Sequence, residues 1–119
     1  MELNEYQERA MSTCMASCEN FSYMMLNLVG EVGEFASKVA KGIRREKIEI
    51  GENQYYEYDS DSTSSLLKLE AGDILWQLSG LCEMMGWSLE EVAQANLHKL
   101  AMRKQAGTID GDGDGIYNR

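Results

Sequence analysis

The chain lacks several features that define whole classes of protein. None of its 119 residues is proline, which favours long uninterrupted helices. Only one residue is histidine, which leaves few ligands for zinc. Its three cysteines, Cys14, Cys18 and Cys82, are an odd set without a disulfide framework, so we expect a reducing, cytoplasmic environment. No apolar run approaches the ~20 residues that cross a bilayer, so we expect a soluble protein with no membrane partner.

Basic residues are also scarce. The chain has 11 lysines and arginines against 20 acidic residues, which gives a net charge of −9. Such a surface repels the phosphate backbone of DNA or RNA, so we expect no nucleic-acid partner. The same repulsion applies to a free nucleotide unless cations intervene.

What the sequence does contain is helical periodicity. Apolar residues recur at steps of three and four, and we expect helices from Leu3 to about Cys18, from Asn20 or Ser22 to about Arg45, from about Thr63–Ser65 to Gly86 and from Ser88 to Gly107. Asn4 is expected to cap the first helix, and Ser88 and Glu91 are expected to form a capping box at the start of the last. Leu66 and Leu69 are among the residues expected on the buried side of the third helix, and residues 48–62 are expected to form a long loop. The prediction is an all-α, four-helix single domain over residues 1–119, with a helical core over 1–107 and a flexible Gly/Asp-rich tail over 108–119.

Two pairs of acids stand on the second and third predicted helices. Glu31 and Glu34 are three residues apart, as are Glu70 and Asp73, so each pair projects from one face of its helix. One such pair alone is most often ordinary solvated surface. If the two helices pack antiparallel, however, the four carboxylates converge, and each like-charge contact near 4 Å costs roughly 4 kcal/mol at an effective dielectric of 20. Bound Mg²⁺, with Mn²⁺ as a substitute, is the solution that an all-oxygen ligand set favours.

Glycines occupy the same turns of these helices. Gly30, Gly33 and Gly72 each cost ~1 kcal/mol relative to alanine inside a helix. We expect their benefit to be a close approach of the helices, or of a phosphate to the backbone.

These residues carry a resemblance to a known family. The stretch LVGEVGEFASKVAKGIRR, followed later by KLEAGDILWQLSGLCEMMGWSLEEVAQANLHKLAMRKQAGTIDG, resembles the MazG-like nucleoside triphosphate pyrophosphohydrolases, an all-α group related to dimeric dUTPases and phosphoribosyl-ATP pyrophosphohydrolases. The resemblance covers nearly the whole chain. It departs from the family pattern at Gly30, where many members have a further glutamate, and in the longer stretch between the two acidic motifs.

The resemblance implies a reaction and roles for particular residues. Glu31, Glu34, Glu70 and Asp73 would hold Mg²⁺, and hydrolysis between the α- and β-phosphates of a nucleoside triphosphate would release a nucleoside monophosphate and pyrophosphate. Glu31 and Glu34 would be the catalytic pair, with Glu34 as general base toward water. The residues expected to contact the substrate are Lys38, Trp76, Asn96, Lys99 and Arg103.

Other interpretations remain open at this stage. Trp76 is more often a core residue than a base-stacking one, and Gly30 in place of a glutamate favours a non-catalytic metal-binding module or nucleotide sensor. A selective enzyme for dUTP, dCTP or a modified nucleotide is a further alternative. The Asp-Gly repeat over 110–115 resembles the start of an EF-hand loop but has no closing glutamate.

Self-association is expected from the amount of apolar surface. A single four-helix unit leaves Met- and Leu-rich helix faces, including Met24, Met25, Met84 and Met85, with too little to bury them. A dimer or tetramer is therefore expected.

The pattern Asn-x-x-Lys-x-x-x-Arg on the last helix yields a testable prediction. Lys99→Ala or Arg103→Ala should raise the Km for nucleotide or lower kcat, because each removes a cation expected at the phosphates. Steady-state kinetics, with circular dichroism to show an intact fold, checks this; wild-type kinetics in both variants would discard the assignment.

Overall fold

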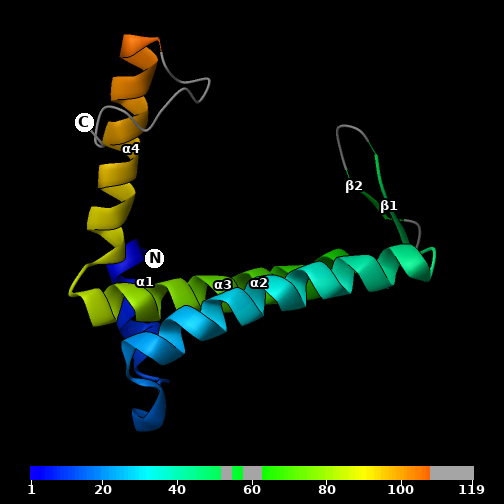
Figure 1. Ribbon diagram of the computed structural model, residues 1–119, viewed down its shortest axis with the longest axis horizontal. Helices are drawn as coiled ribbons and strands as arrows, with labels where there is room; N and C mark the ends of the chain where they lie inside the picture. Colours follow the sequence, from blue (N-terminus) through cyan, green and yellow to red (C-terminus); the bar gives the residue numbers. More distant parts are fainter. Residues whose placement is uncertain (52–54, 58–62, 108–119) are drawn as a thin grey trace.

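The computed structural model describes residues 1–51, 55–57 and 63–107 and confirms the all-α prediction (Figure 1). Its elements in order are α1 (Leu3–Met11), a 3₁₀ turn η1 (Ala16–Cys18), α2 (Phe21–Arg44), β1 (Ile48–Ile50), β2 (Tyr55–Glu57), α3 (Thr63–Met85) and α4 (Leu89–Ala106). None of the helices in the described part of the chain is both long enough and apolar enough to cross a membrane. The predicted tail over 108–119, with its EF-hand-like start, lies outside the described residues.

Helices α2 and α3 run antiparallel along each other and form the long axis of the molecule (Figure 1). Asn20 begins α2 as predicted, because its side-chain Oδ1 accepts a hydrogen bond from the Tyr23 backbone N–H at 2.8 Å. The two helices come closest where Met24 lies against Gly80. Met24 is fully buried there, so the expectation that a single chain leaves it uncovered is wrong for this residue. Gln77 is also buried there and accepts a 2.6 Å hydrogen bond from the Asn27 side chain, so a polar pair fixes how α2 faces α3.

The close approach therefore occurs at Gly80 and not at the glycines we expected. An ideal Cβ on Gly80 would lie 2.6 Å from Met24 Cε, whereas one on Gly33 or Gly72 would have no described atom within 4 Å apart from those of its chain neighbours and its own helix backbone. The expected packing role of Gly33 and Gly72 is thus wrong within a single chain. Sequence offered no means to distinguish these glycines, since all three interrupt helices.

Helix α1 is shorter than predicted and holds the start of α4. It ends at Met11 because Ser12 and Thr13 bond their hydroxyls back to the carbonyls of Arg9 and Ala10, which competes with continued helix. Gln7 is buried and its Oε1 accepts a hydrogen bond from the Leu89 N–H at 2.8 Å. Asn4, which we expected to cap α1, instead accepts a hydrogen bond from the Glu90 N–H at 3.2 Å.

The predicted loop over 48–62 contains a small antiparallel hairpin. Strands β1 and β2 pair with Ile48 opposite Glu57 and Ile50 opposite Tyr55. Ile48 is buried against Gly42, and this contact attaches the start of β1 to α2. Sequence reasoning missed the strands because each has three residues, too few to establish a period of two.

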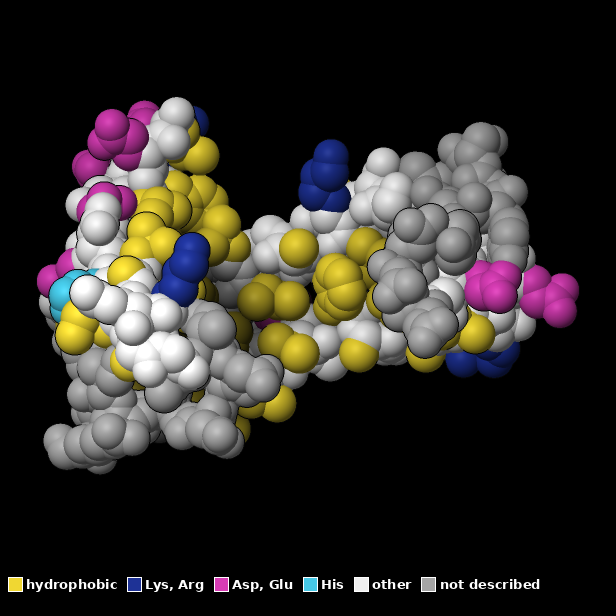
Figure 2. Space-filling model, turned by 90° about the horizontal axis from the view of Figure 1, so that it is seen from above, with side chains coloured by type: hydrophobic (Ala, Val, Ile, Leu, Met, Phe, Trp, Pro, Cys, Tyr) yellow, Lys and Arg dark blue, Asp and Glu magenta, His cyan; other side chains and the backbone are white. Residues whose placement is uncertain are grey.

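Helix α4 begins and ends as predicted but points away from the α2–α3 pair (Figure 1). Ser88 and Glu91 form the expected capping box, and Gly107 ends the helix with a left-handed φ of 75°. The prediction that Leu66 and Leu69 are buried is wrong, since they are 54% and 67% exposed. Figure 2 shows such hydrophobic side chains at the surface of the α2–α3 pair.

The α2–α3 contact predicts opposite effects for two alanine substitutions on α3. Gly80→Ala should lower the free energy of unfolding by about 1–2 kcal/mol, because overpacking against buried Met24 outweighs the gain in helix propensity. The matched control, Gly72→Ala, should raise it by up to about 1 kcal/mol, because nothing opposes the new methyl. Urea unfolding followed by circular dichroism measures both, and equal effects would contradict the close contact at Gly80.

Candidate functional site

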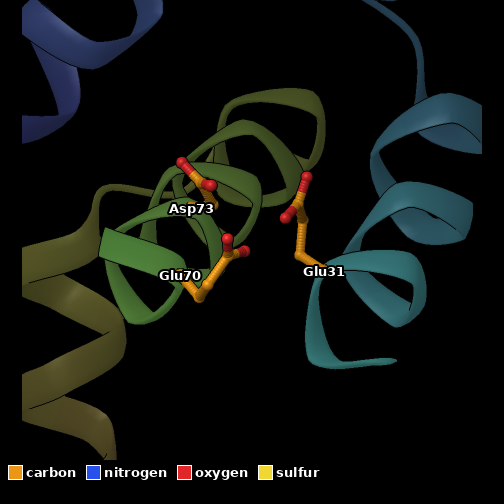
Figure 3. Close-up of side chains that lie close together, drawn as sticks. All are labelled: Glu31, Glu70 and Asp73. Atoms are coloured by element: carbon orange, nitrogen blue, oxygen red, sulfur yellow. The ribbon is translucent and has the colours of Figure 1, made fainter. Parts of the chain in front are cut away.

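Three of the four predicted acids meet between α2 and α3. Glu31 projects from α2 toward Glu70 and Asp73, which stand one turn apart on α3 (Figure 3). One carboxylate oxygen from each lies within 4.8 Å of the other two. The antiparallel packing thus brings together acids about 40 residues apart in the sequence.

The surroundings of Glu31 are unfavourable to its charge. Burial raises the pKa of its carboxyl above the usual 4.5, and the nearby Asp73, Glu70 and Glu34 carboxylates raise it further. A weak hydrogen bond from the Asn27 amide, 3.5 Å from Oε1, acts in the opposite direction. Because Asn27 also donates to Gln77, the polar pair that fixes the helices also orients Glu31.

Glu70 is balanced by a cation. Lys38 Nζ lies 3.1 Å from Glu70 Oε1, and this hydrogen bond raises the pKa of Lys38 above its usual value. The Lys38 side chain is 40% exposed, so the ion pair itself adds little stability. The ion pair does, however, place Lys38, which is predicted to contact the substrate, at the edge of the acidic group.

The three carboxylates fit a small divalent cation. Oxygen ligands about 2.1 Å from one Mg²⁺ lie at most about 4.2 Å apart, so oxygens within 4.8 Å need only small side-chain rotations to share an ion. The ligand set is all oxygen, which favours Mg²⁺ or Mn²⁺ over softer metals. Glu34 is not among the three; it is exposed, one turn further along α2.

Trp76 has a structural partner in the chain. Its ring N–H donates to the Ala10 carbonyl at 3.0 Å and to Thr13 Oγ1 at 2.9 Å, so the indole holds the end of α1 against α3. Tyr6 lies in the same region, and burial together with the nearby Asp73 charge raises the pKa of its hydroxyl. Sequence analysis did not single out Tyr6, since only the tertiary packing of α1 brings it near Asp73.

The other predicted substrate contacts lie on α4 and stay apart from the acids within one chain. Asn96 is exposed, and Lys99 and Arg103 are half-buried. Their helix points away from α2 and α3 (Figure 1). The single chain therefore assembles the acidic group and Lys38 but does not bring the α4 residues to it.

Comparison with known proteins finds similarity over most of the chain. The family model described as the MazG nucleotide pyrophosphohydrolase domain matches residues 19–108, which include all three clustered acids and α4. The gene 37 protein of Mycobacterium phage L5 is 37% identical over 99 residues, which cover 82% of this chain and 78% of that protein. No solved structure is significantly similar to the chain.

The raised Glu31 pKa predicts how stability depends on pH without metal. A carboxyl whose pKa is raised by folding contributes stability that is complete below its usual value of 4.5 and is lost as the pH rises through the raised pKa. Glu31→Gln, which cannot ionise, should therefore have a higher Tm than the wild type at neutral pH, and the difference should shrink toward about pH 4.

Thermal unfolding of both proteins in a chelating buffer measures this difference. Glu8→Gln, an exposed carboxyl on α1, is the matched control and should leave the Tm difference small at every pH. A Glu31→Gln protein that is less stable than the wild type at neutral pH would contradict the assigned environment.

Proposed function

The chain belongs to the MazG nucleotide pyrophosphohydrolase domain family, and on that premise we propose that it is a Mg²⁺-dependent nucleoside triphosphate pyrophosphohydrolase. The reaction is hydrolysis between the α- and β-phosphates, which yields a nucleoside monophosphate and pyrophosphate. Mn²⁺ is the expected substitute metal. The nucleotide substrate is the partner that this activity requires.

The proposal rests on one observation. One carboxylate oxygen from each of Glu31, Glu70 and Asp73 lies within 4.8 Å of the other two, which is close enough for the three side chains to bind a single cation. Leaving them together without a cation is unfavourable, as the raised Glu31 pKa indicates. Keeping these carboxylates together lowers the stability of the fold, and such a cost is typical of a functional site. The cation also removes the objection that a chain of charge −9 repels a nucleotide.

Each residue of the site has a definite task in this proposal. Glu31, Glu70 and Asp73 would hold the metal, which when bound neutralises phosphate charge and lowers the pKa of an attacking water. Glu34 is exposed one turn from Glu31 and would accept the proton of that water. Lys38, now paired with Glu70, would turn to the incoming phosphates.

Self-association into a dimer or tetramer is part of the proposal. The described chain leaves large apolar side chains exposed, among them Leu26 at 75%, Val29 at 69%, Leu69 at 67% and Leu97 at 61%. A second copy packed on these surfaces would cover them. It would also allow Asn96, Lys99 and Arg103 of one copy to reach the acids of another.

A non-catalytic metal-binding module is the second candidate, because Gly30 replaces a family glutamate and Glu34 stands outside the three-acid group. In that case the metal would join α2 and α3 as a structural link. Such a protein would gain stability from Mg²⁺ and release no pyrophosphate.

Two substitutions separate these roles. Asp73→Asn should lower pyrophosphate release by about 100-fold and abolish the rise in Tm that Mg²⁺ gives the wild type, because it removes a ligand. Glu34→Gln should lower kcat by a similar factor and keep the Mg²⁺-dependent rise, because it removes a base and not a ligand. Coupled detection of pyrophosphate and thermal unfolding with and without Mg²⁺ measure both effects.

A control variant and the wild type complete the test. Glu8→Gln should retain turnover and the Tm response, and circular dichroism should show unchanged helicity in every variant. The wild type is assayed with canonical, deoxy and modified triphosphates. If it releases no pyrophosphate from any of them but is still stabilised by Mg²⁺, the enzyme proposal is wrong and the non-catalytic metal-binding module is supported.

A further inference from the structure

The polar pair of Asn27 on α2 and Gln77 on α3 lies between the buried helix contact and the acidic group. Asn27 Nδ2 donates to Gln77 Oε1 at 2.6 Å and lies 3.5 Å from Glu31 Oε1. Gln77 Nε2 in turn lies 3.5 Å from Met24 Sδ, which can accept a weak hydrogen bond. A continuous row of polar contacts therefore runs from a fully buried methionine to a half-buried acid.

The chemistry of the two ends of this row fixes the direction of its hydrogen bonds. A thioether sulfur and a carboxylate can each only accept, so both ends require a donor. Gln77 presents its amide nitrogen to Met24 and its oxygen to Asn27. Asn27 presents its amide nitrogen both to Gln77 and to Glu31. If both amides were turned over, an amide oxygen would face the sulfur at one end and the carboxylate at the other, so the reversed arrangement is disfavoured at both ends.

Burial makes this arrangement difficult to change. Gln77 is 2% exposed, and an amide group that loses its partner in such a place costs about 1–3 kcal/mol. An ideal Cβ on Gly30 would lie 3.6 Å from Asn27 Oδ1, so the oxygen of the Asn27 amide is on the side of Gly30 and its nitrogen is on the side of the acid. The orientation of Asn27 is thus set from within the helix contact.

Helix packing alone accounts for the bond between Asn27 and Gln77 but not for the donor at the acid. Asn27 precedes Glu31 by four residues on one face of α2, so the nitrogen that meets Gln77 also reaches the carboxylate. Residues that orient a metal ligand typically change metal affinity by about 10- to 100-fold when they are removed. Because the contact with Glu31 is long, at 3.5 Å, we expect the lower end of that range.

We infer that Asn27 and Gln77 are positioning residues that raise the affinity of the acidic group for its metal. Gln77 is oriented by Met24 and holds Asn27. Asn27 in turn holds the Glu31 carboxylate beside the other two acids, and this carboxylate keeps further lone pairs with which to bind an ion. The inference rests on the metal site of the proposed function, and it links metal affinity to the packing of α2 on α3.

Calorimetric titration of the chain with Mg²⁺ alone tests this inference without nucleotide or turnover. Asn27→Leu keeps a side chain of similar size without the amide and should weaken Mg²⁺ binding by about tenfold. Gln77→Met should weaken it by about threefold, because Asn27 is still present but is no longer held. The double variant should bind Mg²⁺ no more weakly than Asn27→Leu alone, because Gln77 acts only through Asn27.

Leu67→Val is the matched control for a loss of packing. Leu67 is buried on α3 and takes no part in the polar pair, so this variant should have a lower Tm without metal and a Kd for Mg²⁺ within about twofold of the wild type. Circular dichroism should show equal helicity in every variant before titration. If Asn27→Leu loses helicity, Asn27→Ala removes the same amide without added bulk and takes its place in the test.

The outcomes separate this inference from the proposed function. Wild-type Mg²⁺ affinity in both single variants would show that the polar pair serves packing alone, and would overturn the inference even in an active enzyme. Losses that add up in the double variant would overturn the action of Gln77 through Asn27. Selective losses that do not add up support the inference even in a chain that releases no pyrophosphate. A wild type that does not bind Mg²⁺ would overturn both the metal site and its positioning residues.

Discussion

The antiparallel contact between α2 and α3 is the constraint on which the rest of the molecule depends. Met24 against Gly80 sets how closely the helices approach, and the Asn27–Gln77 hydrogen bond sets how they are rotated about their axes. Rotation matters because it determines which face of α2 meets α3, and here Glu31 faces Glu70 and Asp73 (Figure 3). The same amide of Asn27 reaches Glu31, so helix packing and the orientation of the acid share one side chain.

Charge is arranged along this helix pair in two opposed groups. Acids meet near its middle and cations gather at the end of α2, with Lys38 between them. The acidic group taken alone is unfavourable, because two packed helices hold like charges together. A divalent cation would offset the repulsion within the acidic group. With such a cation in place, a chain of charge −9 would repel the proposed nucleotide less.

The orientation of helix α4 is a second unusual feature of the chain. Its N-terminus is well anchored, by the Ser88–Glu91 capping box and by Gln7 of α1, but the body of the helix points away from the other long helices. Exposed apolar residues such as Leu97 and Leu69 are then left on separate surfaces. A second copy of the chain would bury such surfaces, which is why the proposed site includes contributions from α4.

The sequence by itself determined the features that depend on neighbours along the chain. Asn20 and the Ser88–Glu91 box start helices, Gly107 ends one, and the three-residue spacing of Glu70 and Asp73 places them on one face, because capping and helical period are local. Only the tertiary structure decided that Glu31 and not Glu34 joins that pair, that Gly80 is the contact glycine, and that Tyr6 lies near Asp73. These outcomes depend on helix rotation and crossing, which are set by side chains far apart in sequence.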